Sequence, residues 1–296
     1  MHIPIPTLFT GLLLALLTGC SAVPVQLQLV SASPHESKQS TAASCLLPRA
    51  ASIQPVVAER HGLNPQRIAV LNWNIYKGQR DNWQQDFRQL IQQQDIILLQ
   101  EALLHETFET QLREQNLHWT LNHSFHYGDN KTGVLTAARN NPLTSCGLRA
   151  TEPLIRTPKT ALLQTYRISG HAEPLMVANI HGINFTLGTA SYEQQLTAIV
   201  NILNKHQGPI IFAGDFNNWS DDRSAVLERM VKTLQLDAVP YSNHNRTRVF
   251  GHTIDHIYYR GLEVVEHKTI EVSSSDHNPI MVQFRINQSQ LSWNQP

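Results

Sequence analysis

The pattern of hydrophobic positions changes near residue 68. From there to residue 284, short apolar runs rich in Ile, Val and Leu recur between polar segments. Runs of this length predict buried β-strands. The runs lie at Ile68–Ile75, Ile96–Leu99, Val134–Ala138, Ala161–Ile168, Leu175–Ile180, Ile210–Ala213, Ile254–Tyr259 and Ile280–Phe284.

Three segments between these runs have helical spacing of their apolar residues, namely Asp81–Gln94, Tyr192–His206 and Asp222–Leu236. The second stops at Gly208, and the third follows an Asp that can cap it. Some strands follow one another directly and others alternate with helices. This order predicts two packed sheets with outer helices, in a single domain over residues 67–286.

The N-terminal region has a different character. Its apolar run Leu8–Leu17 would span about 15 Å as a helix, half of the ~30 Å hydrocarbon core, so it is typical of a signal peptide. Leu17-Thr18-Gly19-Cys20 resembles the bacterial lipobox, although the n-region lacks Lys and Arg. We therefore predict a lipoprotein signal peptide over residues 1–19 and lipidation at Cys20. The alternatives are an uncleaved anchor or a misassigned start codon.

Residues 20–66 are rich in Ser, Ala, Pro and Gln, and we expect a flexible tether there. Residues 287–296 form a polar tail. If Cys20 is acylated, Cys45 and Cys146 remain. In an oxidising periplasm they either form one disulfide or stay as two separate thiols, and the sequence leaves both open.

Composition narrows the class of protein. The 296 residues are 41% hydrophobic and 16% charged, which fits a globular chain with a sizeable core. Lys+Arg and Asp+Glu are both 23, so the formal net charge is zero. A neutral chain does not hold duplex nucleic acid mainly by bulk charge, although it can still contact a few phosphates.

Acidic, amide and imidazole side chains cluster where the predicted strands end. Taken singly, each has a structural explanation as a turn, a cap or a core residue, but their joint occurrence points to a site. The segments are Asn72-Trp-Asn74-Ile-Tyr76, Gln100-Glu101, Asn179-Ile-His181, Gly214-Asp215-Phe-Asn217, Ile254-Asp255-His256-Ile257 and Ser275-Asp276-His277-Asn278-Pro279.

In this order, the set QE…GDFN…SDH closely resembles the endonuclease/exonuclease/phosphatase superfamily, over about Ile68 to Phe284. Within it, segments such as NWNIYKGQR and SDHNPIMVQF look most like the YafD-like bacterial branch. The resemblance implies an α+β fold, a four-layer αββα sandwich of two packed, mainly antiparallel sheets. It also implies divalent-metal-dependent phosphoester hydrolysis.

The resemblance assigns three residues to metal binding. Glu101 matches the main metal ligand, Asn74 an amide that helps to place the metal or the phosphate, and Asp276 a second carboxylate on the metal side. Mg²⁺ prefers one or two carboxylates plus waters, and Mn²⁺ accepts the same oxygen donors. The expected cofactor is therefore Mg²⁺ or Mn²⁺.

The same resemblance assigns the groups that handle water and protons. Asp215 matches the group that orients or deprotonates the attacking water, and Asn217 a donor to the phosphoryl oxygens. His277 matches the catalytic histidine, and Asp255 the carboxylate that orients it. An Asp–His pair of this kind can hold a proton near neutral pH.

His181 matches a histidine of the deoxyribonuclease and sphingomyelinase branches, and Lys159 falls where relatives carry a phosphate-contacting Arg. In the deoxyribonuclease branch a glutamate supports this histidine. No clear equivalent is present near Tyr127–Gly133, where Asp129 is the nearest carboxylate. His181 then either stabilises charge or supplies a proton together with His277, or it is only a hydrogen-bond donor to phosphate.

Aromatic and basic residues near the motifs have two explanations. They could stack bases and hold phosphates, or they could belong to the core and to a solvated loop, which we favour. These residues are Trp73, Tyr76, Trp219, Arg246 and Arg248.

Together these features predict a lipid-anchored, metal-dependent phosphodiesterase of nuclease type. The alternatives are a phospholipid or phosphoinositide phosphodiesterase or phosphatase, and an inactive binding module. The expected partners are a nucleic acid or phospholipid substrate and, through the anchor, a membrane. We expect a monomer at the bacterial outer membrane, facing the periplasm or the cell surface, or a cytoplasmic protein if the start codon is misassigned.

Overall fold

The computed structural model describes residues 23–34, 36–45, 62–241 and 245–287. The predicted signal peptide, the lipidation site Cys20 and nearly all of the polar tail lie outside the described residues. Within the described part of the chain, no helix is both long enough and apolar enough to cross a membrane.

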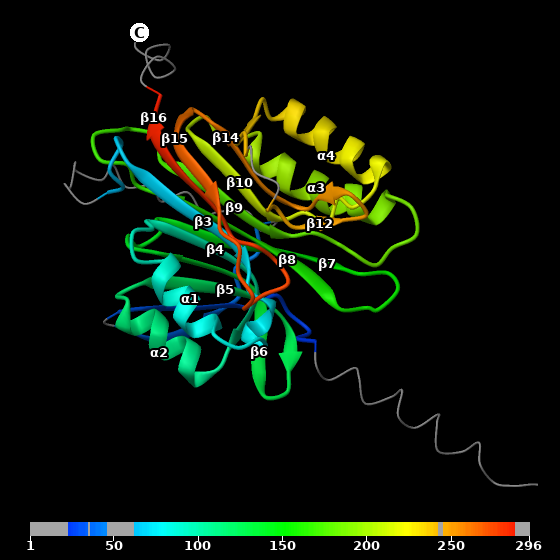
Figure 1. Ribbon diagram of the computed structural model, residues 1–296, viewed down its shortest axis with the longest axis horizontal. Helices are drawn as coiled ribbons and strands as arrows, with labels where there is room; N and C mark the ends of the chain where they lie inside the picture. The colour runs from blue at the N-terminus through cyan, green and yellow to red at the C-terminus, as the bar shows by residue number, and fades with distance from the viewer. Residues whose placement is uncertain (1–22, 35, 46–61, 242–244, 288–296) are drawn as a thin grey trace, which may run out of the picture.

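Two large sheets form the body of the molecule (Figure 1). The first has the strand order β15-β16-β3-β4-β6-β5-β1-β2, and the second β11-β14-β10-β9-β8-β7. Only the pairs β3–β4 and β9–β10 within these sheets are parallel, so both sheets are mainly antiparallel. The strand bounds are β1 Leu29–Ser33, β2 Glu36–Thr41, β3 Ile68–Asn74, β4 Ile96–Leu104, β5 His118–Tyr127, β6 Asn130–Ala138, β7 Thr144–Thr151, β8 Pro158–Tyr166, β9 Leu175–His181, β10 Ile210–Asp215, β11 Asp237–Ala238, β14 Asp255–Arg260, β15 Leu262–Thr269 and β16 Ile280–Ile286, with a separate small pair β12 Arg248–Val249 and β13 His252–Thr253.

Helices cover the outer face of each sheet (Figure 1). Phe87 and Phe108, from the helices α1 and α2, share a core with the first sheet, and Leu196 and Val226, from α3 and α4, share one with the second. A third core, which includes Val70 and other apolar side chains of both sheets, fills the space between them. The structure is therefore the predicted four-layer αββα sandwich. The helices are η2 Tyr76–Gly78, α1 Trp83–Leu90, α2 Glu106–Glu114, α3 Ala190–Leu203 and α4 Asp221–Thr233.

The layered architecture explains why the hydrophobic pattern predicts the central strands. Every residue of β3 and of β10 is buried, because each strand has the partner sheet on one face and helices on the other. Strands that are buried on both faces appear as continuous apolar runs. The third predicted helix begins at Asp221, and its N-cap is Ser220, whose hydroxyl accepts a hydrogen bond from the backbone N–H of Arg223.

The predicted flexible tether over residues 20–66 is wrong for the segment that forms β1 and β2. These strands pair with each other, and β1 also pairs with β5, which places both at the edge of the first sheet. Only Leu29 and Val30 of β1 are buried. Backbone hydrogen bonds therefore order this segment, and its polar sequence carries little apolar signal.

The segment that follows β2 is joined to the second sheet. Cys45 and Cys146 form a disulfide, which settles the alternative that the sequence left open. Next to it, Ser44 forms a bridge with Gly147 of the edge strand β7. The N-terminal strands thus belong to the first sheet, while the segment after them is covalently linked to the second.

Candidate active site

Strand ends from both sheets converge to form the site. Asn74 ends β3 and pairs in register with Gln100, which precedes Glu101 in the parallel strand β4. In the second sheet, Asp215 ends β10 in register with His181 of the parallel strand β9. Asp255, the first residue of β14, pairs with Asp215 from the other side. Parallel strands that end together bring these side chains to one edge of the sandwich.

Buried amides connect the two sheets beneath this edge. The Gln100 side-chain amide donates to Oδ1 of Asn179 at 2.7 Å and to Oδ1 of Asn72 at 2.9 Å. The Asn179 amide in turn donates to the backbone oxygen of Leu135 at 3.0 Å. Oε1 of Gln100 and Nδ2 of Asn72 have no hydrogen-bond partner among the described residues, so the donated hydrogen bonds alone hold the network together. This network fixes how the first sheet, which carries Glu101, faces the second.

Asp215 lies at the centre of the site and is 2% exposed. Its Oδ2 accepts from Nδ2 of Asn74 at 3.1 Å, and its Oδ1 accepts from the backbone N–H of Asn217 at 3.0 Å. Burial raises the pKa of Asp215 to about 6, although His277 opposes the shift. A carboxylate with this pKa can accept a proton and release it near neutral pH.

Asp255 and His277 form a buried ion pair. Nδ1 of His277 lies 2.8 Å from Oδ2 of Asp255, and Nε2 of His277 lies 3.9 Å from Oδ2 of Asp215. Burial alone would lower the pKa of His277, but the charge and hydrogen bond of Asp255, aided by Asp215, raise it to about 10. His277 is thus an imidazolium at neutral pH, with its Nε2 proton directed toward Asp215.

The loop that carries His277 is held on all sides. The backbone oxygen of His277 accepts a hydrogen bond from Nε1 of the buried Trp73 at 2.9 Å. The Ser275 hydroxyl donates to the backbone oxygen of Asn74 at 2.7 Å and accepts from the backbone N–H of His277 at 3.1 Å. Arg80 adds a hydrogen bond to the Ser275 carbonyl. These contacts fix the histidine relative to β3.

His181 has a different partner. The ammonium of Lys159 lies 2.7 Å from its Nε2, which is also 3.5 Å from Oδ2 of Asp215 and 3.9 Å from Oε1 of Glu101. Burial and then the charge of Lys159 hold the pKa of His181 well below its usual value. His181 is therefore neutral, and its Nε2 accepts a hydrogen bond from the ammonium of Lys159. Asp129 lies exposed in the turn between β5 and β6.

Glu101 faces the cleft because the strand is locally distorted. The register between β4 and β6 shifts between Leu99 and Ala102, and Glu101 has a positive φ of 52°. Bulges commonly redirect a side chain next to an active site. The carboxylate forms an ion pair with Nζ of Lys77, a residue that the sequence interpretation missed.

The donor set fits the implied divalent cation. Glu101 offers a carboxylate that already attracts a cation, and the Asn74 side-chain amide lies at the adjacent strand end. Mg²⁺ can bind through one or two carboxylates with waters completing its shell. Among the described residues, no group of three or more His, Cys, Asp or Glu side chains is arranged to hold a metal ion, so waters would have to supply most of the shell. Asp276 is exposed and accepts from the Ser275 hydroxyl at 3.4 Å.

A cavity of about 220 Å³ opens beside Glu101 and His181. Its walls combine the two lysines of the site with hydroxyl and apolar side chains from β5, β8 and two loops. The lining residues are Lys77, Glu101, Ser124, Phe125, Thr132, Gly133, Ile155, Thr157, Pro158, Lys159, Thr160, His181 and Phe185.

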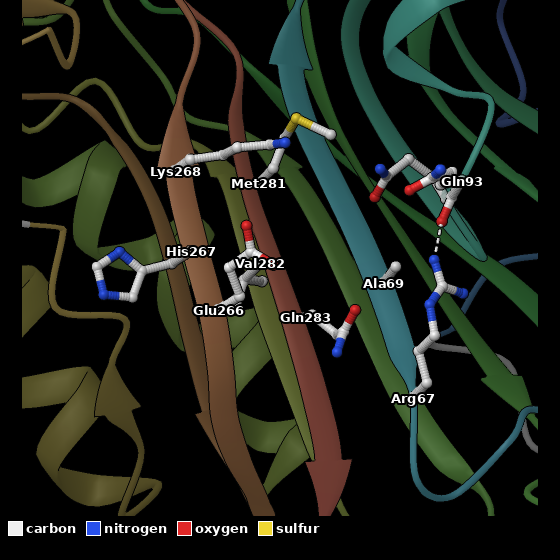
Figure 2. Close-up of a pocket in the computed structure, with 10 residues that line it drawn as sticks. Arg67, Ala69, Gln93, Glu266, His267, Lys268, Met281, Val282 and Gln283 are labelled. Carbon is white, nitrogen blue, oxygen red and sulfur yellow. Dashed lines mark hydrogen bonds between the residues drawn. The ribbon is translucent and has the colours of Figure 1, made fainter.

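A second hollow, of about 70 Å³, lies at the opposite end of β3, which begins after Arg67. Figure 2 shows that Arg67 hydrogen-bonds the backbone oxygen of Gln93, while His267 points away from both. Its titratable side chains do not converge on one point. This hollow is therefore not a second catalytic centre.

The aromatic and basic residues near the motifs mostly serve packing. Trp73 is buried, and Trp219 lies over the guanidinium of the buried Arg223. Arg246 donates to the backbone oxygen of Asp255 and stacks over Tyr241. These contacts agree with the structural explanation that the sequence favoured for them.

Glu152 is a second residue that sequence reasoning missed. It is completely buried, and its Oε1 accepts from the backbone N–H groups of Asn184 at 2.5 Å and Phe185 at 3.1 Å. Its Oε2 accepts from the Thr157 hydroxyl at 3.4 Å. Glu152 thus joins the β7–β8 loop to the loop that follows His181. A single Glu in a loop between two strands gives no sequence signal for such a role.

Comparisons with known proteins support the family and the fold. Residues 71–277 match the Endonuclease/Exonuclease/phosphatase family, which covers more than half of the chain. The chain belongs to this family. It is 40% identical over 237 residues to a UPF0294 protein of Vibrio campbellii, a match that covers 79% of this chain and 82% of that one. This relationship is consistent with the YafD-like branch suggested by the motifs.

Solved structures share the fold at low identity. The human Nocturnin catalytic domain with bound sulfate anion superimposes with a TM-score of 0.62 and 19% identity, covering 77% of this chain and 96% of that one. ANGEL2, described as a 2',3'-cyclic phosphatase, gives a TM-score of 0.52 at 15% identity over 75% and 96%. At these identities the likeness establishes the architecture of the chain.

Proposed function

We propose that the protein is a divalent-metal-dependent phosphodiesterase of nuclease type. The family supports a phosphoesterase at the coarser level. The observation that carries the finer proposal is the position of Asp215. Its Oδ2 lies 3.5 Å from the neutral His181 and 3.9 Å from the charged His277. A carboxylate base beside a charged imidazolium suits hydrolysis of a diester, in which water must lose a proton and the leaving oxygen must gain one.

Asp215 would accept the proton of the attacking water. Asn74 and the backbone N–H of Asn217 hold the carboxylate in place. His277, kept as an imidazolium by Asp255, would donate its Nε2 proton to the leaving oxygen or stabilise charge on the phosphoryl group. The neutral His181 has its Nε2 occupied by Lys159, so the proton supply falls to His277.

Glu101 and Asn74 would hold the cation, with Asp276 a further carboxylate in the same loop as His277. When bound, Mg²⁺ or Mn²⁺ would neutralise charge on the phosphate oxygens. Lys77, which now balances the charge of Glu101, would have to give up that carboxylate. Lys159, which hydrogen-bonds His181, would contact phosphoryl oxygens. Asn217 would do so only if its side-chain amide released the backbone oxygen of Gly182, to which it donates at 3.1 Å.

We also propose that the protein is a monomeric lipoprotein anchored through Cys20 to the bacterial outer membrane. The lipobox supports this location, and the Cys45–Cys146 disulfide fits an oxidising compartment. Two or more acyl chains make such an anchor stable. Cys20→Ser should abolish labelling with palmitate and release the protein from membranes after cell fractionation. A Cys20→Ser protein that still labels contradicts the anchor.

The direct test of the activity is turnover of bis(p-nitrophenyl) phosphate by residues 21–296, which retain every described residue. We expect turnover that a chelator abolishes and that added Mg²⁺ or Mn²⁺ restores. Tight binding of phosphate compounds without turnover would instead favour an inactive binding module. Activity that is indifferent to chelator would contradict the metal-dependent chemistry.

A phospholipid phosphodiesterase is the second candidate. It is favoured by large apolar side chains that are exposed on the loops beside the cavity, such as Leu154 and Phe185. Folded proteins seldom expose such groups together without a partner. A comparison of turnover on DNA, RNA, phospholipids and phosphoinositides separates this candidate from a nuclease.

A further inference from the structure

Exposed apolar side chains are concentrated at the active-site end of the molecule. Among the described residues, nine large hydrophobic side chains are exposed, and only Leu143 and Val265 lie elsewhere. The other seven are called here the apolar rim: Val25, Tyr127, Leu154, Ile155, Phe185, Leu187 and Phe250. Scattered exposed hydrophobics need no explanation, but a cluster around one opening indicates an interaction surface.

The two principal loops of the rim are fixed to each other. Leu154 and Ile155 are in the loop between β7 and β8, and Phe185 and Leu187 are in the loop after β9. The buried Glu152 accepts hydrogen bonds from the second loop while it belongs to the first. Ile155 and Phe185 also line the catalytic cavity. The loop tips therefore form one connected surface at its mouth.

The rim continues on the far side of the second loop. Nε1 of Trp219 donates to Oδ1 of Asn184 at 2.8 Å, and the Trp219 ring meets Phe250 edge-on at 5.9 Å between centroids. Phe250 is 83% exposed and lies in the turn between β12 and β13. Tyr127, at the opposite side, hydrogen-bonds Gln79 at 3.0 Å.

The N-terminal segment joins the body beside this rim. The Arg149 guanidinium donates to the backbone oxygens of Pro24 at 2.6 Å and Val25 at 3.1 Å. The backbone oxygen of Gln28 accepts from the N–H of His123, whose neighbour Ser124 lines the cavity. In Figure 1 the blue start of the described chain lies at the same side as the β7–β8 loop. The predicted anchor therefore approaches from the active-site end.

The length of chain between anchor and body is short. Only Ser21, Ala22 and Val23 separate Cys20 from Pro24. Four residue steps of extended chain span at most about 14 Å. A membrane that holds acyl chains on Cys20 would then lie close to the residues that surround the cavity, not at the far end of the sandwich.

The charge of the rim loops suits a lipid surface. The loop of residues 152–157 reads Glu-Pro-Leu-Ile-Arg-Thr and residues 183–189 read Ile-Asn-Phe-Thr-Leu-Gly-Thr. Glu152, the acidic side chain of these two stretches, is buried and bonded to backbone N–H groups, so no carboxylate faces solvent from either of them. Arg156 is exposed beside Leu154 and Ile155. Apolar side chains flanked by a cation bind well at the boundary between headgroups and acyl chains.

We infer that the apolar rim docks on a lipid bilayer and holds the catalytic cavity against it. Leu154, Ile155, Phe185 and Leu187 would enter the interface, with Arg156 at the level of the headgroup phosphates. Docking in this orientation presents the site with the phosphodiesters of lipid headgroups. That substrate class rests on the second candidate of the proposed function, the phospholipid phosphodiesterase, whereas the docking itself does not depend on turnover.

The test uses residues 21–296, without acyl chains, and vesicles of phosphatidylethanolamine and phosphatidylglycerol. Co-sedimentation is measured in the presence of chelator, so that catalysis plays no part. The double variant Leu154→Ser/Leu187→Ser should lower the partition coefficient at least about tenfold, because two exposed apolar side chains are lost from the interface. The control Leu143→Ser/Val265→Ser removes two exposed apolar side chains outside the rim and should leave partitioning within about twofold.

Thermal melting checks that both double variants fold as the parent does, which their exposed positions favour. The inference is overturned if the parent protein stays in the supernatant, or if both double variants lose vesicle binding equally. It is also overturned if the rim variant loses affinity for single-stranded DNA while its vesicle binding stays unchanged. Vesicle binding without turnover of any diester contradicts only the proposed function, and turnover without vesicle binding contradicts only this inference.

Discussion

The two histidines that flank Asp215 are nearly equally buried, but one is neutral and the other is positively charged. His181 is 8% exposed and His277 is 9% exposed. Lys159 next to His181 helps to hold its pKa well below the usual value, whereas Asp255 next to His277 raises its pKa to about 10. Burial alone favours the neutral form of both rings. The charged partner of each ring, and not its degree of burial, therefore decides which ring is protonated on both nitrogens.

The contrast extends to the regions around them. The His277 side is closed, because Trp73, Ser275 and Asp255 all hydrogen-bond the residue. The His181 side opens into a cavity in which Lys77 balances Glu101. A preorganised region suits proton transfer, and a region that holds an exchangeable cation suits metal and phosphate binding.

The largest expected effect is on the closed side. His277→Ala should lower turnover about 10²–10⁴-fold, the typical contribution of one acid–base group, with KM changed less. Asp255→Asn should cause a similar loss, and the double variant should be little worse than His277→Ala, because the pair acts as a unit. Steady-state kinetics measure all three.

Thermal melting of the same proteins supplies the control. If the melting points fall in step with activity, or if the two losses multiply as independent effects, the pair is structural. His206→Gln provides a matched variant, because His206 lies outside the site and its Nε2 contacts the backbone oxygen of Pro174 at 3.0 Å. This variant should retain turnover.

The next effect concerns the open side. Glu101→Gln keeps the shape of the side chain and removes its charge. We expect affinity for Mn²⁺ to fall at least about 100-fold, with low turnover and an unchanged fold. Isothermal calorimetry with Mn²⁺ measures this directly. If Glu101→Gln binds the ion as tightly as the parent, the ligand assignment is wrong.

The pH profile reports the base between the two regions. Asp215 is active as a carboxylate, and its pKa is raised to about 6. Turnover at saturating metal should therefore decrease about tenfold per pH unit below about 6, as the carboxylate becomes protonated. The hydrogen bond from Asn74 favours the ionised form. Asn74→Ala should accordingly move the inflection to higher pH, and a profile that is flat through this range contradicts the assignment.

The smallest effect concerns Lys77. Lys77→Met removes the ammonium that competes for Glu101 and should raise the affinity for Mn²⁺ up to about fivefold, as expected for a partly exposed ion pair. Calorimetry with Lys131→Met as a control separates this local effect from a general change in charge. Weaker binding in Lys77→Met would show that the lysine supports the metal site instead.

The sequence predicted what depends on buried strands and on short motifs. The runs that become β3 and β10 are apolar throughout because both faces are covered, and the predicted residues Asp215, Asp255 and His277 lie in contact. By contrast, β5 was missed because it buries polar residues. Its Asn122, for example, donates to the backbone oxygens of Leu148 and Ala161, so an apolar pattern is absent.

Two features of the site depended on contacts that are distant in sequence. Lys77 reaches Glu101 only because the backbone at residues 76–78 has positive φ, which no motif predicts. Glu152 acts through the loop after His181, more than 30 residues away in the chain. Local pattern identifies strands and the groups at their ends, but it does not show which charged side chains the fold brings opposite them.

¹⁵N NMR of the imidazole nitrogens would measure directly whether His181 is neutral and His277 is charged. The spectra are recorded at about pH 8, well above the usual histidine pKa. Assignment uses the variants His181→Ala and His277→Ala. The account predicts that His277 carries protons on both nitrogens while His181 is neutral at the same pH. Two neutral rings, or a charged His181 beside a neutral His277, would contradict the division of the site into a proton-holding side and a cation-binding side.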